Sequence, residues 1–345
     1  MKEHDNEEEE DPFACFDDGD DDDSDEEESS KKTHDDDEEK NKINQVKKRD
    51  ADCGILSFHP NTESSLLIHV QNTITTSSSS SSQQVKNAID QFCHERHWMM
   101  HVGPEKAKIL EEELCYSIDL FLQQQQKKTM KMNHFICVEL GTYCGYASLV
   151  LGDILKQYSN NNNNNSSKKE KVDFHLYTVE INPMYAQIAT KMIQLANLQE
   201  YITVVNITIN MDGITTDLIE CLQHEITIRE EARRFCSNDT ESTMTTTTTT
   251  TSQINFLMID HDKDRYKQDL ILLEQSKMIL RGTTVVADNV LFANIMDYVT
   301  YVQLLATKGI VTTITRVCKV EYSTDEDGEE DGVELTRFIM DPVVT

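Results

Sequence analysis

The chain has 345 residues and a formal net charge of −30, because 62 Asp and Glu residues outnumber 32 Lys and Arg residues. Phosphate groups are bound by basic surfaces, so this balance argues against binding to nucleic acid or to an anionic membrane. The nine cysteines form no CxxC pair, and there is no apolar run of about 18 residues, the length that spans a bilayer. We therefore expect a cytoplasmic protein with reduced thiols and no membrane segment.

The first part of the chain is strongly acidic. Residues 1–50 contain 23 acidic and 8 basic residues, so like charges repel one another and few apolar side chains are available for burial. We expect residues 1–62 to form a disordered acidic tail and linker, and residues 63–345 to form the folded domain. Four homopolymer tracts interrupt that domain and are expected to be surface loop insertions, at residues 77–82, 123–126, 160–165 and 245–251.

Apolar, β-rich runs alternate with helical patterns from about residue 85 onward. Seven strands are predicted, at residues 135–140, 174–179, 202–205, 256–259, 283–287, 312–317 and 335–340. Several of these runs are continuously apolar, which is typical of strands buried on both faces. An acidic loop is expected at residues 325–331, before the last strand.

The clearest helix follows the second strand. Asn182 is a suitable N-cap, Pro183 suits the first turn, and the apolar residues recur at helical spacing. These residues are Met184, Ile188, Met192 and Leu195. The alternation predicts a doubly wound, Rossmann-like α/β sheet of seven strands with helices on both faces. Ligands of such sheets bind beyond the carboxyl ends of the strands.

The first two predicted strands end in residues that suit a nucleoside cofactor. Glu139, Gly141 and Gly145 form an ExGxxxG turn, whose glycines allow the backbone to approach a ligand and whose following helix favours an anionic group, such as the carboxylate of S-adenosylmethionine. Glu180 ends the second strand, where an acid accepts hydrogen bonds from ribose hydroxyls. A tight strand–helix turn and a solvated acid would also explain these two features.

The fourth and fifth predicted strands end in hard oxygen ligands. Asp260 follows the fourth strand, and Asp288 and Asn289 follow the fifth. Two carboxylates and an amide oxygen at neighbouring strand ends suit Mg²⁺. Lys263, in the same segment as Asp260, would be placed to remove a proton from a hydroxyl beside the metal. The alternative is that all four are ordinary polar loop residues.

Six short segments resemble, in sequence and in order, the catechol O-methyltransferases, a family of class I S-adenosylmethionine-dependent methyltransferases. They are residues 98–103 (WMMHVG), 138–146 (VELGTYCGY), 180–183 (EINP), 260–266 (DHDKDRY), 287–290 (ADNV) and 320–322 (VEY). Residues 67–70 are also similar to the first helix of that family. The resemblance covers residues 63 to 341 apart from the insertions, and it implies the same fold and activity.

The resemblance also implies roles for individual residues. S-adenosylmethionine would be held by Val102, Glu139, Gly141, Tyr143, Ala147, Ser148, Glu180, Ile181, Asp260 and His261. Mg²⁺ would be ligated by Asp260, Asp288 and Asn289. Lys263 would be the general base, and Glu321 would accept a hydrogen bond from the hydroxyl that is not methylated. The substrate-binding residues would be Trp98, Asp262, Lys263, Asn289 and Glu321.

Some positions depart from the family pattern. Asp262 and Ala293 replace a tryptophan and a proline beside the substrate ring, which would make the ring slot looser and more negative and would favour cationic catechols. Ala147 replaces a serine that contacts the methionine carboxylate, with Ser148 one residue later, and His101 replaces an asparagine. The adenine-contacting segment is rewritten, and its stand-ins would be Thr215 and Thr216.

The predicted function is Mg²⁺-dependent transfer of a methyl group from S-adenosylmethionine to one hydroxyl of a small catechol-type substrate, by a monomeric enzyme. Two alternatives stay open at this point. One is an O-methyltransferase for another metal-chelating phenol. The other is a non-catalytic binding protein that keeps the fold and uses its acidic tail for partners.

Overall fold

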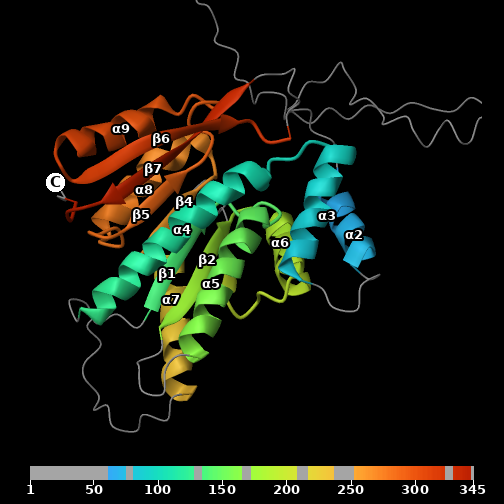
Figure 1. Ribbon diagram of the computed structural model, residues 1–345, viewed down its shortest axis with the longest axis horizontal. Helices are drawn as coiled ribbons and strands as arrows, with labels where there is room; N and C mark the ends of the chain where they lie inside the picture. The colour runs from blue at the N-terminus through green and yellow to red at the C-terminus, as the bar shows by residue number, and fades with distance from the viewer. Residues whose placement is uncertain are drawn as a thin grey trace, which may run out of the picture. The chain divides into compact units, whose positions relative to one another are not determined.

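A seven-stranded sheet lies at the centre of the folded part of the chain (Figure 1). The structure is a computed structural model that describes residues 61–74, 81–127, 134–164, 172–207, 217–236, 252–322 and 329–342. Residues 1–60, which carry nearly all of the predicted tail, lie outside the described residues, so that prediction stays untested. The first described helix, α2, begins at Thr62.

The strand order confirms the doubly wound α/β class. The strands are β1 (His134–Leu140), β2 (Asp173–Glu180), β3 (Ile202–Asn206), β4 (Phe256–Ile259), β5 (Thr284–Ala287), β6 (Val311–Lys319) and β7 (Glu330–Phe338). Their order in the sheet is β3-β2-β1-β4-β5-β7-β6. The first five are parallel, whereas β7 is antiparallel to both β5 and β6. All seven predicted strands are present.

The boundary of the last strand differs from the prediction. β7 begins at Glu330, so Asp331 belongs to the strand and is fully buried rather than exposed in an acidic loop. The sequence pattern placed Asp331 with the acidic residues before it because an unpartnered carboxylate is rarely buried. The prediction of a loop through residue 331 was therefore wrong.

Helices cover both faces of the sheet (Figure 1). One hydrophobic cluster joins the sheet to α2 (Thr62–Ile74), α3 (Ser82–Glu95), α4 (Gly103–Gln126), α5 (Tyr146–Asn164) and α6 (Pro183–Leu195). A second cluster joins it to α7 (Leu218–Cys236), α8 (Tyr266–Gln275) and α9 (Met296–Thr307). Phe135 and Cys137 of β1 pack into the first cluster and Ile136 and Val138 into the second, so this strand is buried on both faces as predicted.

The helix predicted after the second strand is confirmed as α6. The Asn182 side chain accepts a hydrogen bond from the Met184 amide at 2.9 Å and caps the helix, and Pro183 occupies its first turn. Ile188 and Met192 are buried in the core, but Met184 is 45% exposed. Among the described helices, none has both the length and the apolar composition needed to cross a bilayer.

Three of the four homopolymer tracts take part in helices, so their prediction as loops was wrong over the described residues. Ser81 is the N-cap of α3 and forms a capping box with Gln84. The glutamine tract ends α4, and α5 continues to Asn164 in the asparagine tract. Polar tracts show no helical repeat of apolar residues, so the sequence gives no sign of a helix there. Adding residues to a helix that has already formed nevertheless costs little free energy. Residues 77–80 and 245–251 lie outside the described residues.

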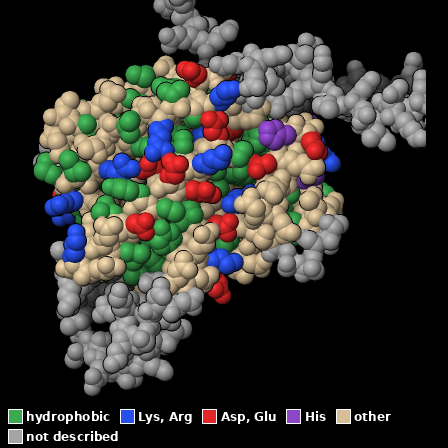
Figure 2. Space-filling model, in the orientation of Figure 1, with side chains coloured by type: hydrophobic (Ala, Val, Ile, Leu, Met, Phe, Trp, Pro, Cys, Tyr) green, Lys and Arg blue, Asp and Glu red, His purple; other side chains and the backbone are tan. Residues whose placement is uncertain are grey.

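Ion pairs connect helix α4 to strands β6 and β7. The Glu113 carboxylate of α4 contacts the guanidinium groups of Arg316 and Arg337, and Arg316 also lies 2.7 Å from Glu112. Figure 2 shows basic and acidic side chains interspersed across the middle of this face. These ion pairs connect the middle of α4 to β6 and β7.

Candidate active site

The turn after β1 brings three strand ends together. Gly141 has a φ of 95°, and a Cβ atom there would lie 2.1 Å from the Asp260 carbonyl oxygen at the end of β4, so this close approach requires glycine. Tyr143 has a φ of 47°, and its amide donates to Glu180 Oε2 at 2.7 Å at the end of β2. The Tyr143 hydroxyl donates to Glu63 Oε1 of α2 at 2.9 Å. The turn is therefore fixed from both sides of the strand ends.

Backbone amides fix the Glu180 carboxylate at the end of β2, and its role in binding ribose stays a prediction. Its two carboxylate oxygens accept hydrogen bonds from the amides of Tyr143 and Asn182, at 2.7 and 2.9 Å. Burial raises the pKa of Glu180 above its ordinary value, although these amide donors oppose that shift. Ile181 follows and is 49% exposed, so the edge beyond Glu180 is open to a ligand.

Glu139 and Ser148 interact with each other in the interior. Glu139 is fully buried, and the Ser148 hydroxyl of α5 donates a hydrogen bond to its carboxylate. Burial raises the pKa of Glu139 to about 8, above its usual range. Since the Ser148 hydroxyl donates its hydrogen bond to Glu139, the structure does not support Ser148 as the replacement for the serine that the family has at position 147. Ala147 itself is buried.

The proposed metal ligands lie together at the ends of β4 and β5. Ile259 and Ala287 are paired in register, so Asp260 and Asp288 follow adjacent strand ends. The ammonium of Lys263 donates to Asp260 Oδ1 at 2.8 Å and to Asn289 Oδ1 at 3.0 Å. These two oxygens thus converge on one cationic centre, and carboxylate and amide oxygens are the kind of donor that Mg²⁺ takes in proteins.

Asn289 and Tyr266 complete the surroundings of Lys263. Asn289 has a φ of 58°, and its amide donates to Asp288 Oδ1 at 2.8 Å, which fixes the two neighbouring ligands relative to each other. The Lys263 ammonium also lies 2.9 Å from the hydroxyl of Tyr266. Burial, followed by the charge of Asp260, raises the pKa of Tyr266 well above its ordinary value, so Tyr266 stays protonated.

A second cluster beside these ligands was missed by the sequence analysis. Lys106 of α4 is 1% exposed, and its ammonium contacts the carboxylates of Asp288, Glu321 and Asp331 at 2.7, 2.6 and 2.5 Å. Gly103 permits this arrangement, because a Cβ atom there would lie 2.7 Å from Glu321 Cγ. The one available signal was the position of Lys106, one helical turn after the Val102-Gly103 pair.

Burial and charge act in opposite directions on this cluster. Burial would lower the pKa of Lys106, but Asp288, Glu321 and Asp331 raise it well above its ordinary value. Burial also raises the pKa of Asp288 to about 6, and burial together with Asp288 raises that of Glu321 to about 9. The pKa of Asp331 is lowered despite burial, because Lys106 and two backbone amides stabilise its charge. Lys106 is accordingly charged.

The segment before α4 lies along the same site. The indole Nε1 of Trp98 donates to the Glu321 carbonyl at 2.8 Å, and Val102 is buried next to Gly103. His101 packs against the rings of Tyr143 and Tyr146, with centroids 5.2 and 5.8 Å away. Burial lowers the pKa of His101 to about 3, so this imidazole is neutral.

His261 and Asp262 differ in how well they match their expected roles. His261 Nε2 is 2.8 Å from Asp269 Oδ2, and its ring stacks on Tyr266 with centroids 5.3 Å apart. Among the described residues, none is a hydrogen-bond partner of its buried Nδ1. Asp262 is exposed, and its carboxylate accepts a hydrogen bond from the Asp264 amide as the N-cap of η1 (Lys263–Arg265).

The role of Asp262 beside the substrate ring stays a prediction. Its exposed carboxylate caps a short helix, which is also the arrangement expected if its charge has no effect on the choice of catechol. Ala293 is half-buried in the turn after β5. The adenine-contacting stand-ins Thr215 and Thr216 lie outside the described residues.

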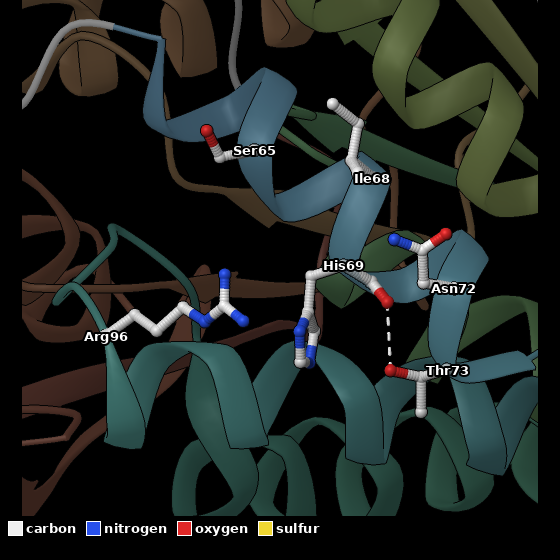
Figure 3. A pocket seen from close by; sticks show the side chains of 6 residues that line it. All are labelled: Ser65, Ile68, His69, Asn72, Thr73 and Arg96. Carbon is white, nitrogen blue, oxygen red and sulfur yellow. Dashed lines mark hydrogen bonds between the residues drawn. The ribbon is translucent and has the colours of Figure 1, made fainter. Parts of the chain in front are cut away.

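A separate hollow lies away from these strand ends. It has a volume of about 390 Å³ and is formed by α2 and Arg96 (Figure 3). Its lining residues are Ser65, Ile68, His69, Asn72, Thr73 and Arg96. None of them is a predicted site residue, so the carboxyl ends of the strands remain the candidate active site.

Comparisons with known proteins find similarity to methyltransferases. A family model described as a methyltransferase domain matches residues 138–290. Catechol O-methyltransferase of Bos taurus is 29% identical over 221 residues, which are 64% of this chain and 60% of that protein. Catechol O-methyltransferase B of Danio rerio is 27% identical over 253 residues, 73% of this chain and 72% of that protein. The chain spans about three fifths of the bovine and murine catechol O-methyltransferases that it matches.

Solved structures with a similar arrangement include two bacterial O-methyltransferases. The enzyme of Bacillus cereus in complex with SAH has a TM-score of 0.42 and 16% sequence identity, covering 82% of this chain and 93% of that chain. TomG of Streptomyces achromogenes in complex with SAM has a TM-score of 0.43 and 16% identity, covering 79% and 95%. Residues 138–290 thus match a methyltransferase-domain model, and the chain is similar to the catechol O-methyltransferases.

Proposed function

We propose that this chain is a Mg²⁺-dependent O-methyltransferase that transfers the methyl group of S-adenosylmethionine to one of two adjacent hydroxyls of a catechol. The observation that carries the proposal is the convergence of Asp260 and Asn289 oxygens on the Lys263 ammonium, beside Asp288. Metal ligands and a proton acceptor therefore lie within one hydrogen-bonded group at the carboxyl edge of the sheet.

Charge balance supports a divalent cation at this edge. The carboxylates of Asp260, Asp288, Glu321 and Asp331 oppose the ammonium groups of Lys106 and Lys263. The formal charge of the cluster is −1 while Glu321, whose pKa is raised to about 9, is protonated, and −2 when all four acids are ionised. Asp260, Asp288 and Asn289 would hold Mg²⁺, which would balance that charge. When bound, Mg²⁺ would lower the pKa of two adjacent substrate hydroxyls and orient them.

The residues of the chain then have distinct tasks. Lys263 acts as a base only after its ammonium has lost a proton to solvent, a loss that a neighbouring divalent cation would favour. The neutral amine then takes the proton of the reacting hydroxyl, and a positioned base of this kind contributes about 10²–10⁴-fold in rate. The substrate oxygen forms a bond to the methyl carbon while the carbon–sulfur bond breaks, which leaves S-adenosylhomocysteine. Glu321 accepts a hydrogen bond from the second hydroxyl. Glu180 and the turn at Gly141 hold the methyl donor in line, and such alignment is worth as much as about 7–11 kcal/mol.

Two positions that lie beside the substrate ring in the family carry no bulky side chain here. Asp262 is exposed and caps a short helix, and Ala293 is small where the family has proline. We therefore include larger metal-chelating phenols among the expected methyl acceptors. A non-catalytic binding role is less consistent with an intact ligand set and lysine base.

A methylation assay tests the proposal. The purified chain is incubated with methyl-labelled S-adenosylmethionine and either catechol or guaiacol, in which one of the two hydroxyls is already blocked. We expect label in catechol only, lost in EDTA and restored by Mg²⁺. Asp260→Asn should lower kcat/KM at least about 100-fold through loss of a metal ligand.

The matched control is Asp264→Asn, which removes an exposed carboxylate four residues further along the same segment. This variant should stay within about threefold of the wild type, as expected for a surface position. Methylation of catechol that is equally fast in EDTA, or equal use of guaiacol, would contradict the proposed function.

A further inference from the structure

The ammonium of a buried lysine lies among three carboxylates next to the proposed Mg²⁺ ligands. One oxygen from each of Asp288, Glu321 and Asp331 lies within 4.8 Å of the others, a spacing at which carboxylates hold a metal ion. The Lys106 ammonium lies among them, 2.5 to 2.7 Å from each. The position that a cation would take is thus filled by a side chain of the protein.

Two of these three acids, Asp331 and Asp288, have hydrogen-bond partners besides the lysine. Asp331 accepts hydrogen bonds from Asn289 Nδ2 at 2.8 Å and from the amides of Phe292 and Gly332 at 3.1 and 2.6 Å. Asp288 follows β5 and accepts from the Asn289 amide. Asp288 and Asp331 therefore keep hydrogen-bond partners of their own when the lysine side chain is changed.

A cation is needed at this position. Burying ionised carboxylates without a partner of opposite charge is unfavourable, and the side chains of Asp288, Glu321 and Asp331 are 4%, 5% and 0% exposed. A divalent ion would satisfy the same oxygens and would share Asp288 with the proposed Mg²⁺. Pairs of metal ions in two-metal enzymes are about 3.5–4 Å apart, a separation that a shared carboxylate can bridge.

We propose that Lys106 is the fixed second cation of this site. Its ammonium takes the place of the second ion of a two-metal centre and limits the chain to one divalent ion. Lys106 is a positioning residue, because it acts on Asp288 and Glu321 and not on the reacting atoms. This inference rests on the proposed function, since it takes Asp288 as a ligand of Mg²⁺.

Counting bound Mn²⁺ tests the inference without measuring activity. The full chain is titrated with micromolar Mn²⁺ at 0.15 M salt, which weakens binding to exposed acids, and free Mn²⁺ is measured by electron paramagnetic resonance. We expect one tightly bound ion in the wild type and two in Lys106→Met. The two ions should give an exchange-coupled spectrum, which isolated ions on the acidic tail do not produce.

Lys86→Met is the matched control. Lys86 is also a buried lysine, 3.2 Å from Asp153, but this pair joins α3 to α5 away from the strand ends. The Lys86→Met variant changes the net charge by the same amount as Lys106→Met, and we expect it to bind one Mn²⁺ ion. Combining Lys106→Met with Asp331→Asn should return the count to one, because the second site loses a ligand.

The outcomes separate the inference from the proposed function. One ion in Lys106→Met, or two in the wild type, would overturn the inference alone. No tight ion in the wild type would overturn the metal assignment of the proposed function. If Lys106→Met does not fold, Lys106→Gln is titrated in its place, with two ions expected. Asp331→Asn in the presence of Lys106 should keep one ion, and loss of that ion would show that the three acids bind it, against the inference.

Discussion

Two lysines face carboxylates at the same sheet edge, but they differ in access to a substrate. The Lys263 side chain is 26% exposed and contacts Asp260, whose side chain is 18% exposed. Lys106 is 1% exposed. A group that takes a proton from a substrate must reach it, whereas a group that balances buried charge need not. The exposure of the two side chains therefore supports Lys263 as the base and Lys106 as a fixed cation.

Replacing Lys263 tests its assignment as the base. Lys263→Met should lower kcat by about 10²–10⁴-fold, because the lost proton transfer occurs in the transition state. The affinity for S-adenosylhomocysteine, measured by calorimetry, should change less than about threefold. Lys267→Met, one turn further along in α8, is the control and should keep the wild-type kcat. A loss of affinity equal to the loss of rate would make Lys263 a binding residue instead.

The sequence could predict the residues whose partners are near in the chain or at adjacent strand ends. Asp260, Asp288 and Asn289 each follow a recognisable strand, so the order of strands places them together. Lys106 and Asp331 are 225 residues apart, and their contact depends on how α4 crosses the β6–β7 pair. A single sequence does not show such a contact, so Lys106 was missed.

At the scale of elements, the strands were easier to predict than the helix ends. Strands buried on both faces give continuous apolar runs, which mark β1 and β4 clearly. The ends of α4 and α5 consist of glutamine and asparagine, whose helical state depends on extension of a helix that has already formed. The antiparallel place of β7 between β5 and β6 was also beyond the sequence, since it depends on pairing of distant strands.

The start of α3 provides a test at this scale. The Ser81 side chain accepts a hydrogen bond from the Gln84 amide, and Gln84 Oε1 accepts one from the Ser81 amide at 2.8 Å. Ser81→Ala should lower the free energy of unfolding by about 1 kcal/mol through loss of this cap. Urea denaturation measures the effect. Ser82→Ala, one residue into the same helix, is the control and should not be destabilised, and equal values for the two variants would contradict the assigned cap.

At the scale of the whole molecule, buried neutral histidines couple stability to pH. His175 of β2 is 2% exposed, and its Nε2 lies 2.8 Å from the Thr203 hydroxyl of β3. Burial, followed by the charge of Arg229, lowers the pKa of His175 to about 3. In the unfolded chain histidine titrates near about 6.5, so between these two values the unfolded state binds the proton and the folded state does not. The contribution of His175 is thus fully present above pH 6.5 and is lost progressively as the pH falls towards 3.

This coupling predicts a measurable difference between variants. From pH 7 to pH 5 the wild type should lose about 2 kcal/mol of unfolding free energy through His175 alone, since each pKa unit corresponds to about 1.4 kcal/mol. In His175→Asn that part of the loss should disappear, although the variant is less stable at pH 7. Urea denaturation at both pH values provides the comparison. His224→Asn replaces an exposed histidine of α7 and should keep the wild-type pH dependence. Equal losses in His175→Asn and the wild type would show that His175 is protonated in the folded chain, against the burial seen in β2.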